Sequence, residues 1–162
     1  MSLLPVAEAQ ARLFGLAEPL SAETVPIGDA VGRWLAQDLI ALRDQPWADL
    51  SAMDGYAVRA AEHPGPWRVT GESTAGGATP APLSAGGALR IFTGAPMPPG
   101  ADAILIQENA TRDGDLLMAS ADPLPVGRHI RARASDFARE TLLLDSGARL
   151  GAAQVALAVL GG

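Results

Sequence analysis

Three short segments of the sequence contain side chains that could do chemistry. In the first, Ser51-Ala52-Met53-Asp54-Gly55-Tyr56, the carboxylate of Asp54 can bind a hard cation or orient a protonated ligand. Gly55 allows an unusual backbone dihedral or the close approach of a ligand. An Asp-Gly pair is also an ordinary turn between strands, and composition alone favours that simpler interpretation.

The second segment runs from Ile91 to Asp102 and contains Phe92-Thr93-Gly94-Ala95. A strand is expected to end at Phe92, so that Thr93 stands where the strand becomes a loop. A hydroxyl and backbone N–H groups at such a point can hold an oxyanion. The alternative is a threonine that satisfies a loop carbonyl in a rigid, proline-rich connection.

The third segment is Gln107-Glu108, which follows an apolar run; a carboxylate there is a ligand or only the solvated end of a strand. Arg128, Arg131 and Arg133 are numerous enough to hold one small anion, or they form an exposed, arginine-rich strand edge.

Composition excludes several kinds of site. The sequence contains no cysteine, so it has no disulfide, thiolate metal site or cysteine nucleophile. The two histidines, His63 and His129, lack the spacing of a zinc site, and His63 is expected to be exposed. A net charge of −6 without a basic cluster argues against nucleic-acid binding. No signal peptide or membrane-length apolar run is visible, so we expect a cytoplasmic protein that has no membrane partner.

These residues are positioned by elements of two kinds. Apolar spacing predicts helices over 5–18, stopped by Pro19, and over 29–37, capped by Asp29. Between 38 and 125, short apolar runs bounded by turn residues predict strands. The expected strands are 56–58, 67–70, 88–92, 103–106 and 116–119, with Asp113-Gly114 as a hairpin turn.

The order of the elements predicts an α+β, β-rich fold. Residues 73–87 are expected to form a long loop, 128–133 and 142–144 strands, and 151–160 a final helix so apolar that another surface must cover it. That surface is a dimer partner or the first helix. We expect a mixed α/β module of residues 1–45 and 128–162, domain I. A β-barrel-like or irregular β domain of residues 46–127, domain II, is inserted into it.

In their order and spacing, these segments resemble the molybdopterin molybdenumtransferase family, which includes bacterial MoeA and the E domain of gephyrin. The matching stretches are Ala30–Ala36, Ser51–Val58, Arg90–Glu108 and Gly127–Asp136. The resemblance covers essentially the whole chain. In that family a third domain, which holds the pterin, follows. The resemblance therefore implies the N-terminal two domains only, with the third absent and little turnover alone.

The resemblance implies an enzyme that inserts molybdate into adenylyl-molybdopterin during molybdenum cofactor biosynthesis. It implies Mg²⁺ as the cofactor, with Asp54 as its ligand and as a catalytic residue beside Thr93, which would donate to an oxyanion. Ser51, Arg131 and Asp136 are implied to bind the substrate or its oxyanion. A homodimer is also implied, with a molybdopterin adenylyltransferase as the partner in the pathway.

The sequence departs from the family pattern at three places: Leu50 replaces an asparagine, Ala134-Ser135 replaces Gly-Glu, and His129 replaces an asparagine. These departures bear most on the segment from Arg131 to Asp136. Two other hypotheses stay open. One is a non-catalytic dimerisation or scaffold module that kept the fold, and the other is a small oxyanion-binding domain.

Overall fold

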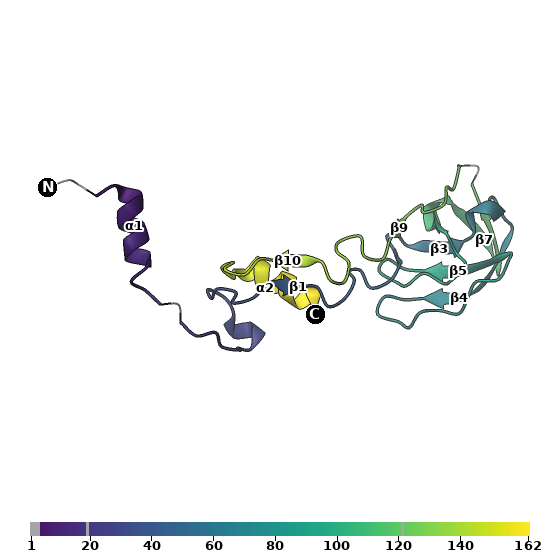
Figure 1. Ribbon diagram of the computed structural model, residues 1–162. Coiled ribbons are helices and arrows are strands. Elements are labelled where there is room, and N and C mark those ends of the chain that lie inside the picture. The colour runs from purple at the N-terminus through teal and green to yellow at the C-terminus, as the bar shows by residue number, and fades with distance from the viewer. Residues whose placement is uncertain (1–3, 19, 121) are drawn as a thin grey trace.

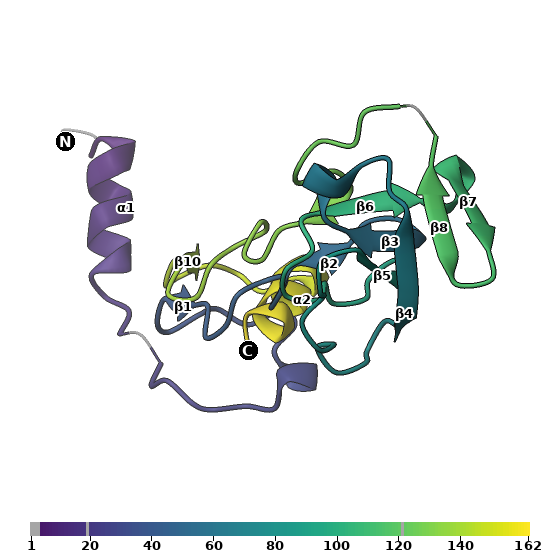
Figure 2. The same cartoon turned by 90° about the vertical axis from the view of Figure 1, so that its right-hand side faces the viewer.

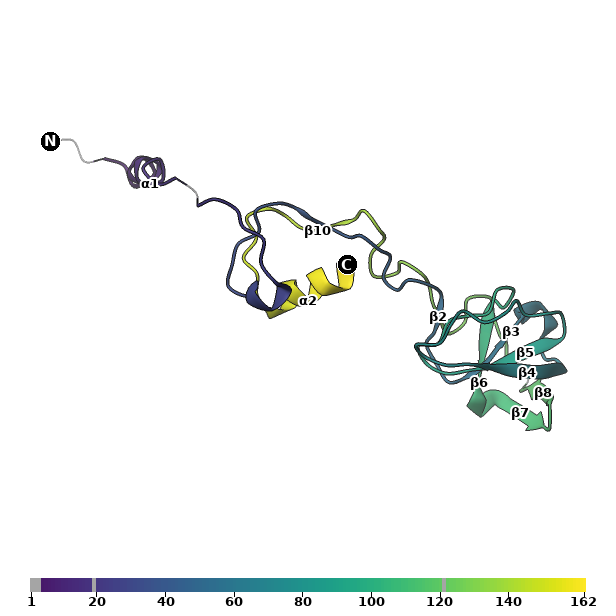
Figure 3. The same ribbon diagram turned by 90° about the horizontal axis from the view of Figure 1, so that it is seen from below.

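The chain is drawn out into three parts in a row, as the computed structural model describes it for residues 4–18, 20–120 and 122–162 (Figure 1). Helix α1 (Val6–Phe14) lies at one end and a six-stranded sheet at the other. Between them, the short strands β1 (Leu39–Ile40) and β10 (Leu142–Leu144) accompany helix α2 (Ala152–Gly161). The view from below shows the same row (Figure 3). No helix in the described ranges has the length and apolar character needed to cross a bilayer.

The sheet has the strand order β6-β3-β5-β4-β8-β7. Its strands are β3 (Gly55–Val58), β4 (Trp67–Ser73), β5 (Gly87–Ile91), β6 (Ala103–Ile106), β7 (Ala110–Asp113) and β8 (Leu116–Ala119). Strand β3 is antiparallel to both of its neighbours, β5 and β6, while β4 and β5 are parallel. Figure 2 shows this sheet from its end of the molecule, with the hairpin of β7 and β8 at one edge.

Apolar side chains pack on both faces of this sheet, because successive residues of a strand point to opposite sides. On β3, Ala57 belongs to one buried cluster, while Tyr56 and Val58 belong to the other. Trp67, Ile104 and Leu117 are fully buried. The α+β, β-rich fold class predicted from the sequence is confirmed.

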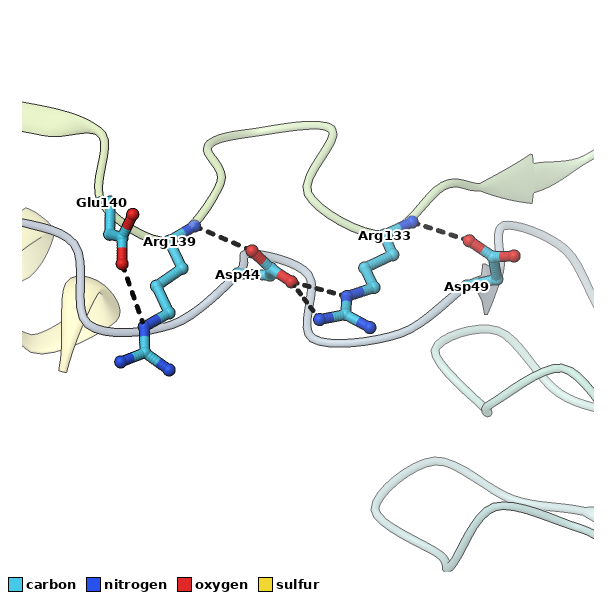
Figure 4. A network of polar contacts seen from close by, with 5 residues as sticks. All are labelled: Asp44, Asp49, Arg133, Arg139 and Glu140. Carbon is cyan, nitrogen blue, oxygen red and sulfur yellow. Dashed lines mark hydrogen bonds and ion pairs between the residues drawn. The ribbon is translucent and has the colours of Figure 1, made fainter.

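Two antiparallel segments, residues 41–49 and 132–141, connect the sheet with the middle of the molecule; we call them the neck. Asp44 accepts hydrogen bonds from the backbone N–H of Arg139 at 2.8 Å and from the guanidinium of Arg133 at 2.5 Å (Figure 4). Asp49 accepts the backbone N–H of Arg133 at 2.7 Å. Two carboxylates thus tie the outgoing segment of the neck to the returning one.

The predicted helix over 29–37 is wrong. Only the 3₁₀ turn η1 (Ile27–Asp29) forms, and the chain then runs alongside residues 147–150. Leu35 donates its N–H to Ala148 at 2.9 Å, and Leu150 donates to Arg33 at 2.8 Å. These cross-chain bonds use the backbone groups that a helix would need, and Gly32 has a positive φ of 86°. Trp34, expected on the buried side, is 68% exposed.

The first helix is shorter than predicted. It begins after Pro5 and ends at Phe14, where Gly15 caps it by donating to the carbonyl of Ala11. Pro19, the expected stop, lies outside the described residues. No residue of α1 is buried, and α1 is apart from α2 in all three views, so the alternative that the last helix packs on the first within one chain is wrong.

The remaining predicted strands and the last helix are present in the structure, but one strand is shorter than predicted, and the two-residue strands β1 and β2 (Leu50–Ser51) and strand β7 were not predicted. The strand expected over 128–133 is only Ile130–Arg131 (β9), because His129 and Ala134, on either side, both have a left-handed φ of 59°. Strand β7 was missed because its residues are polar and lie at an exposed edge. It pairs with β8 across the predicted Asp113-Gly114 turn. The division into domains I and II stays a prediction.

Candidate functional site

Three strand ends meet at one edge of the sheet, and each carries one of the motifs singled out in the sequence. Asp54 directly precedes β3, Thr93 follows β5, and Gln107-Glu108 follows β6 in the 3₁₀ turn η3 (Gln107–Asn109). Gly55 pairs with Ile91 on one side and with Ile106 on the other. Because β3 is antiparallel to both neighbours, its first residue lies beside their last ones. The topology therefore gathers the three motifs.

Asp54 and Thr93 are in direct contact. The backbone N–H and the side-chain hydroxyl of Thr93 both donate to Oδ1 of Asp54, each at 2.8 Å. These two bonds lower the pKa of the Asp54 carboxyl below its ordinary value of 3.8, the backbone bond most, and the charge of Arg90 adds to the effect. Asp54 is therefore an ionised carboxylate at neutral pH, and within the described residues Oδ2 takes no hydrogen bond.

The oxyanion role predicted for Thr93 stays a prediction, with a restriction. Both donors of Thr93 are directed at Asp54. The hydroxyl has one hydrogen, so it cannot donate to Asp54 and to an oxyanion at the same time. In the arrangement described here, Thr93 holds the carboxylate instead of contacting a ligand.

Ser51 ties the turn that carries Asp54 to the turn that carries Thr93. In strand β2 (Leu50–Ser51), its N–H donates to Ala95 at 2.9 Å, and its carbonyl accepts the N–H of Gly94 at 2.8 Å. Its hydroxyl donates to the carbonyl of Met53, and the residue is only 3% exposed. Ser51 is thus placed to shape the two turns, whereas direct contact with substrate, as predicted, would require the first turn to open.

Gly55 is a glycine because of the neighbouring strand. A Cβ atom there would lie 2.1 Å from the carbonyl oxygen of Leu105 and 2.9 Å from Cα of Ile106. No side chain fits at those distances, so β3 and β6 approach closely only with glycine at this position. The close approach of β6 is enough to explain a glycine at position 55. The two reasons inferred from the sequence, an unusual dihedral and the approach of a ligand, are not needed to explain it.

Arg131 and Asp136 form an ion pair with each other, at the border of β9 and the neck. Both side chains are about half exposed, at 50% and 40%. Within the described residues, no hydrogen bond or ion pair joins them to Asp54 or Thr93. The structure therefore brings the four predicted residues together as two separate pairs, and the substrate-binding role of the second pair stays a prediction.

The three arginines considered as an anion site do not act together. Arg131 is paired with Asp136 and Arg133 with Asp44, while Arg128 donates to Nε2 of His129 at 3.1 Å. Two of the three charges are already matched by carboxylates. The hypothesis that the trio holds one anion is therefore wrong for this arrangement.

The two histidines lie in different surroundings. His63, expected to be exposed, is half-buried beside Trp67, with ring centroids 6.5 Å apart and its Nε2 shielded from solvent. His129 lines a cavity of about 450 Å³ together with Ile106 and Asn109; neither Asp54 nor Thr93 lines this cavity. Burial, and then the charge of Arg128, lowers the pKa of His129 below its ordinary 6.5.

Sequence reasoning missed Arg90 as a residue of this edge. Its guanidinium lies over the rings of Tyr56 and Phe92 and donates to Gln107. Glu108, next in the chain, is exposed and accepts a bond from the amide of Gln107 at 3.3 Å. A charged residue within the apolar run of β5 was the available signal, because such a residue needs partners at the strand end.

Comparison with known proteins identifies the family. A family model described as the MoeA N-terminal region (domain I and II) matches residues 4–162. This chain belongs to the MoeA family, as its N-terminal portion. The match covers almost every residue of the chain, including the strand ends that carry Asp54, Thr93 and Gln107.

Individual relatives agree with this assignment. The molybdopterin molybdenumtransferase of Nostoc sp. is 37% identical over 142 residues, which are 83% of this chain and 32% of that protein. Molybdopterin molybdenumtransferase 2 of Mycobacterium tuberculosis is 40% identical over 131 residues, 76% of this chain and 32% of that protein. The crystal structure of a MoeA protein from Pyrococcus horikoshii superposes with a TM-score of 0.88 at 30% identity. The superposition covers 99% of this chain and 43% of the Pyrococcus horikoshii chain.

This MoeA-family chain spans about a third of the length of the curated relatives it matches. Among the described residues, no group of three or more histidine, cysteine, aspartate or glutamate side chains is arranged to hold a metal ion. The role of Asp54 as a metal ligand therefore stays a prediction.

Proposed function

We propose that this chain is the part of a molybdopterin molybdenumtransferase that presents Asp54 to the reacting centre, where molybdate is inserted into adenylyl-molybdopterin in molybdenum cofactor biosynthesis. The named relatives support the reaction class. The observation that carries the proposal is the ionised Asp54 carboxylate, fixed by two bonds from Thr93 at the shared edge of three strands. A scaffold would need the glycines of this fold but not that pair of polar residues.

The donor set at this edge fits Mg²⁺ in one respect. Mg²⁺ is usually bound by one or two carboxylates, and its remaining positions are filled by water and substrate phosphates. Oδ2 of Asp54 supplies one such oxygen, while Oδ1 is held by Thr93. When bound, the ion would neutralise phosphate charge of the adenylylated substrate. Because a single carboxylate binds weakly, we expect binding to depend on the phosphates.

The roles of the other residues follow from their contacts. Thr93 fixes the carboxylate, and Ser51 holds both turns in register. Arg131, paired with Asp136, is our candidate for contact with an anionic substrate, because a guanidinium binds oxyanions through paired donors. The pterin itself would be held in the part of the longer relatives that this chain does not span.

A chimera tests the proposal. This chain replaces the corresponding segment of a full-length relative, and molybdate insertion into adenylyl-molybdopterin is followed in that chimera and in its Asp54→Asn variant. We expect the variant to lose at least ~99% of the activity, because removal of one electrostatic group costs about 10²-fold or more. It should stay folded with only a small drop in melting temperature, because the asparagine oxygen can still accept both bonds from Thr93. Asp122→Asn, at an exposed carboxylate, is the matched control. Normal insertion by the Asp54→Asn variant would remove Asp54 from the site.

A homodimer is part of this proposal. The exposed apolar residues on helices α1 and α2 support it, and they also favour the scaffold hypothesis as a second candidate function. Helix α1 buries none of its residues, although Leu13 and Phe14 are apolar and 65% and 77% exposed. Val159 and Leu160 of α2 are also exposed, at 53% and 44%. Apolar surfaces of this kind need a cover. If the unsubstituted chain forms dimers but shows neither metal binding nor molybdate insertion in the chimera, that result would favour the scaffold hypothesis.

Sedimentation velocity tests the dimer. We expect the chain to sediment as a dimer, and Leu13→Glu with Phe14→Glu to sediment as a monomer. A matched control places a glutamate at Gln10, on the same helix. A wild-type chain that stays monomeric at high concentration would overturn this part of the proposal.

A second proposed partner follows from the substrate. Because the substrate is adenylylated, an adenylyltransferase acting on molybdopterin must supply it, and that protein or domain is the partner we propose.

A further inference from the structure

Arg90 contributes the only positive charge of β5 and lies at the centre of the edge that carries the candidate site. In the antiparallel register it stands directly across from Tyr56 of β3. Its guanidinium carbon lies 5.1 Å from the centroid of the Tyr56 ring and 4.8 Å from that of Phe92. Both distances are within the range of a cation–π contact, so the two rings hold the guanidinium in place.

The same guanidinium makes two hydrogen bonds to neighbouring strands. Nη1 donates to the carbonyl oxygen of Gly55 at 3.1 Å, and Nη2 donates to Oε1 of Gln107 at 2.8 Å. Arg90 therefore contacts the start of β3, the residue after β5 and the residue after β6. Only the fork of an arginine can make such divergent contacts at once.

Each of these contacts adjoins a residue of the candidate site. Gly55 follows Asp54, and Phe92 precedes Thr93. Gln107 donates its backbone N–H to the carbonyl of Asp54 at 3.2 Å. Movement of any one strand end would change the distance between the Asp54 carboxylate and Thr93, and Arg90 restrains all three ends.

We propose that Arg90 is a positioning residue. Its guanidinium contacts all three strand ends and so holds the Asp54 carboxylate in its contact with Thr93. The metal-binding consequence rests on the proposed function, whereas the positioning rests on the contacts alone. The positive charge of Arg90 also favours the ionised form of the Asp54 carboxyl. After the two hydrogen bonds from Thr93, it is the further cause that lowers the pKa of Asp54.

Two Arg90 variants separate this role from simple support of the sheet. Arg90→Met keeps an apolar stem but removes the charge and the hydrogen bonds; Arg90→Lys keeps the charge but loses the fork. Arg68→Met, at an exposed arginine of the neighbouring strand β4, is the matched control. Carbon-detected NMR follows the titration of the Asp54 carboxyl and the shift of the Thr93 amide proton, and calorimetry follows Mg²⁺ binding in the presence of adenosine monophosphate.

We expect Arg90→Met to shift the Asp54 titration to higher pH and to weaken Mg²⁺ binding about 10- to 100-fold, as loss of a residue that orients a ligand does. Arg90→Lys should move the Thr93 amide resonance, while Arg68→Met should leave both signals unchanged. If Arg90→Met does not fold, Arg90→Lys decides the question. A folded Arg90 variant with unaltered Asp54 and Thr93 signals would overturn the proposal.

The two proposals can fail separately. Altered Asp54 and Thr93 signals in the Arg90 variants, together with no Mg²⁺ binding by the unsubstituted chain, would support the positioning role and count against the proposed metal site. Wild-type Mg²⁺ binding that Arg90→Met does not weaken, with an unchanged Asp54 titration, would remove Arg90 and leave the function standing.

Discussion

Thr93 gives both of its hydrogen-bond donors to one oxygen of Asp54, each at 2.8 Å, although the two residues are 39 positions apart. The pair forms because β5 delivers Thr93 to the edge at which β3 begins. It leaves Oδ2 of Asp54 for a ligand and uses the hydroxyl that would otherwise contact an oxyanion. In this arrangement, within the part of the chain that the structure describes, Oδ2 of the carboxylate is the free polar atom of the pair, and the oxyanion role of Thr93 stays a prediction.

Replacing Thr93 by valine should raise the pKa of Asp54, because the hydroxyl bond is the second-largest cause that lowers it. A carboxyl with a lowered pKa stabilises the fold above its ordinary 3.8, and this contribution is lost as the pH falls through its folded value. We therefore expect Thr93→Val to flatten the loss of stability below 3.8. Carboxyl NMR and acid titrations of unfolding measure both effects. Thr93→Ser retains both donors and should behave as the wild type; equal titrations in all three proteins would contradict the prediction.

Replacing Gly55 by alanine should destabilise the sheet severely, because the new Cβ would lie 2.1 Å from the carbonyl oxygen of Leu105. We expect a loss of about 3 kcal/mol or more in the free energy of unfolding, measured by urea titration. Gly71→Ala is the matched control. Its Cβ would meet only Cδ1 of Leu89, at the ordinary distance of 3.5 Å. Similar stabilities of the two variants would show that β3 and β6 can separate without cost.

The neck should open when Asp44 loses its charge. This carboxylate accepts the N–H of Arg139 and pairs with Arg133, and these bonds lower its pKa, that of Arg139 most. In Asp44→Ala we expect faster hydrogen exchange at the Arg139 amide. In the wild type, the same change should appear as the pH falls below the ordinary 3.8 of this carboxyl.

Glu140→Gln is the control for the neck. Its contact with Arg139 is 4.0 Å long and exposed, so it contributes little. We expect exchange at Arg139 to stay as in the wild type, and small-angle scattering to report an unchanged shape. Equal exchange in Asp44→Ala and Glu140→Gln would rule out a restraining role for Asp44.

His129 should make the fold sensitive to mild acid. Burial and the neighbouring Arg128 lower its pKa, so the folded chain binds the proton more weakly than the unfolded chain does. Stability is therefore expected to fall as the pH drops below the ordinary 6.5. His129→Asn should remove this slope. Because asparagine adopts a left-handed φ such as the 59° found here more readily, stability at about pH 8 should be unchanged or raised by up to ~1 kcal/mol. A slope near 6.5 that persists in the variant would contradict this assignment.

Strands that are short apolar runs bounded by turn residues were predictable from the sequence. The runs at 56–58, 88–92 and 103–106 alternate between two buried clusters, so burial itself fixes them. Strand β7 was not predictable because it lies at an edge and has polar side chains, where pairing with β8 and not burial keeps it extended. Residues 29–37 have apolar residues at helical spacing, but pairing with residues 147–150 uses their backbone groups.

The sequence by itself determined the family, the fold class and the identity of Asp54 and Thr93 as a candidate pair, because these depend on residue types at fixed spacing. Only the tertiary structure decided which residues touch. It joined Thr93 to Asp54, turned Arg131 towards Asp136, buried Ser51 in a turn and set Arg90 across three strand ends. The physical reason is that hydrogen bonds and ion pairs act over a few ångströms, and strand pairing decides which distant residues come within that range.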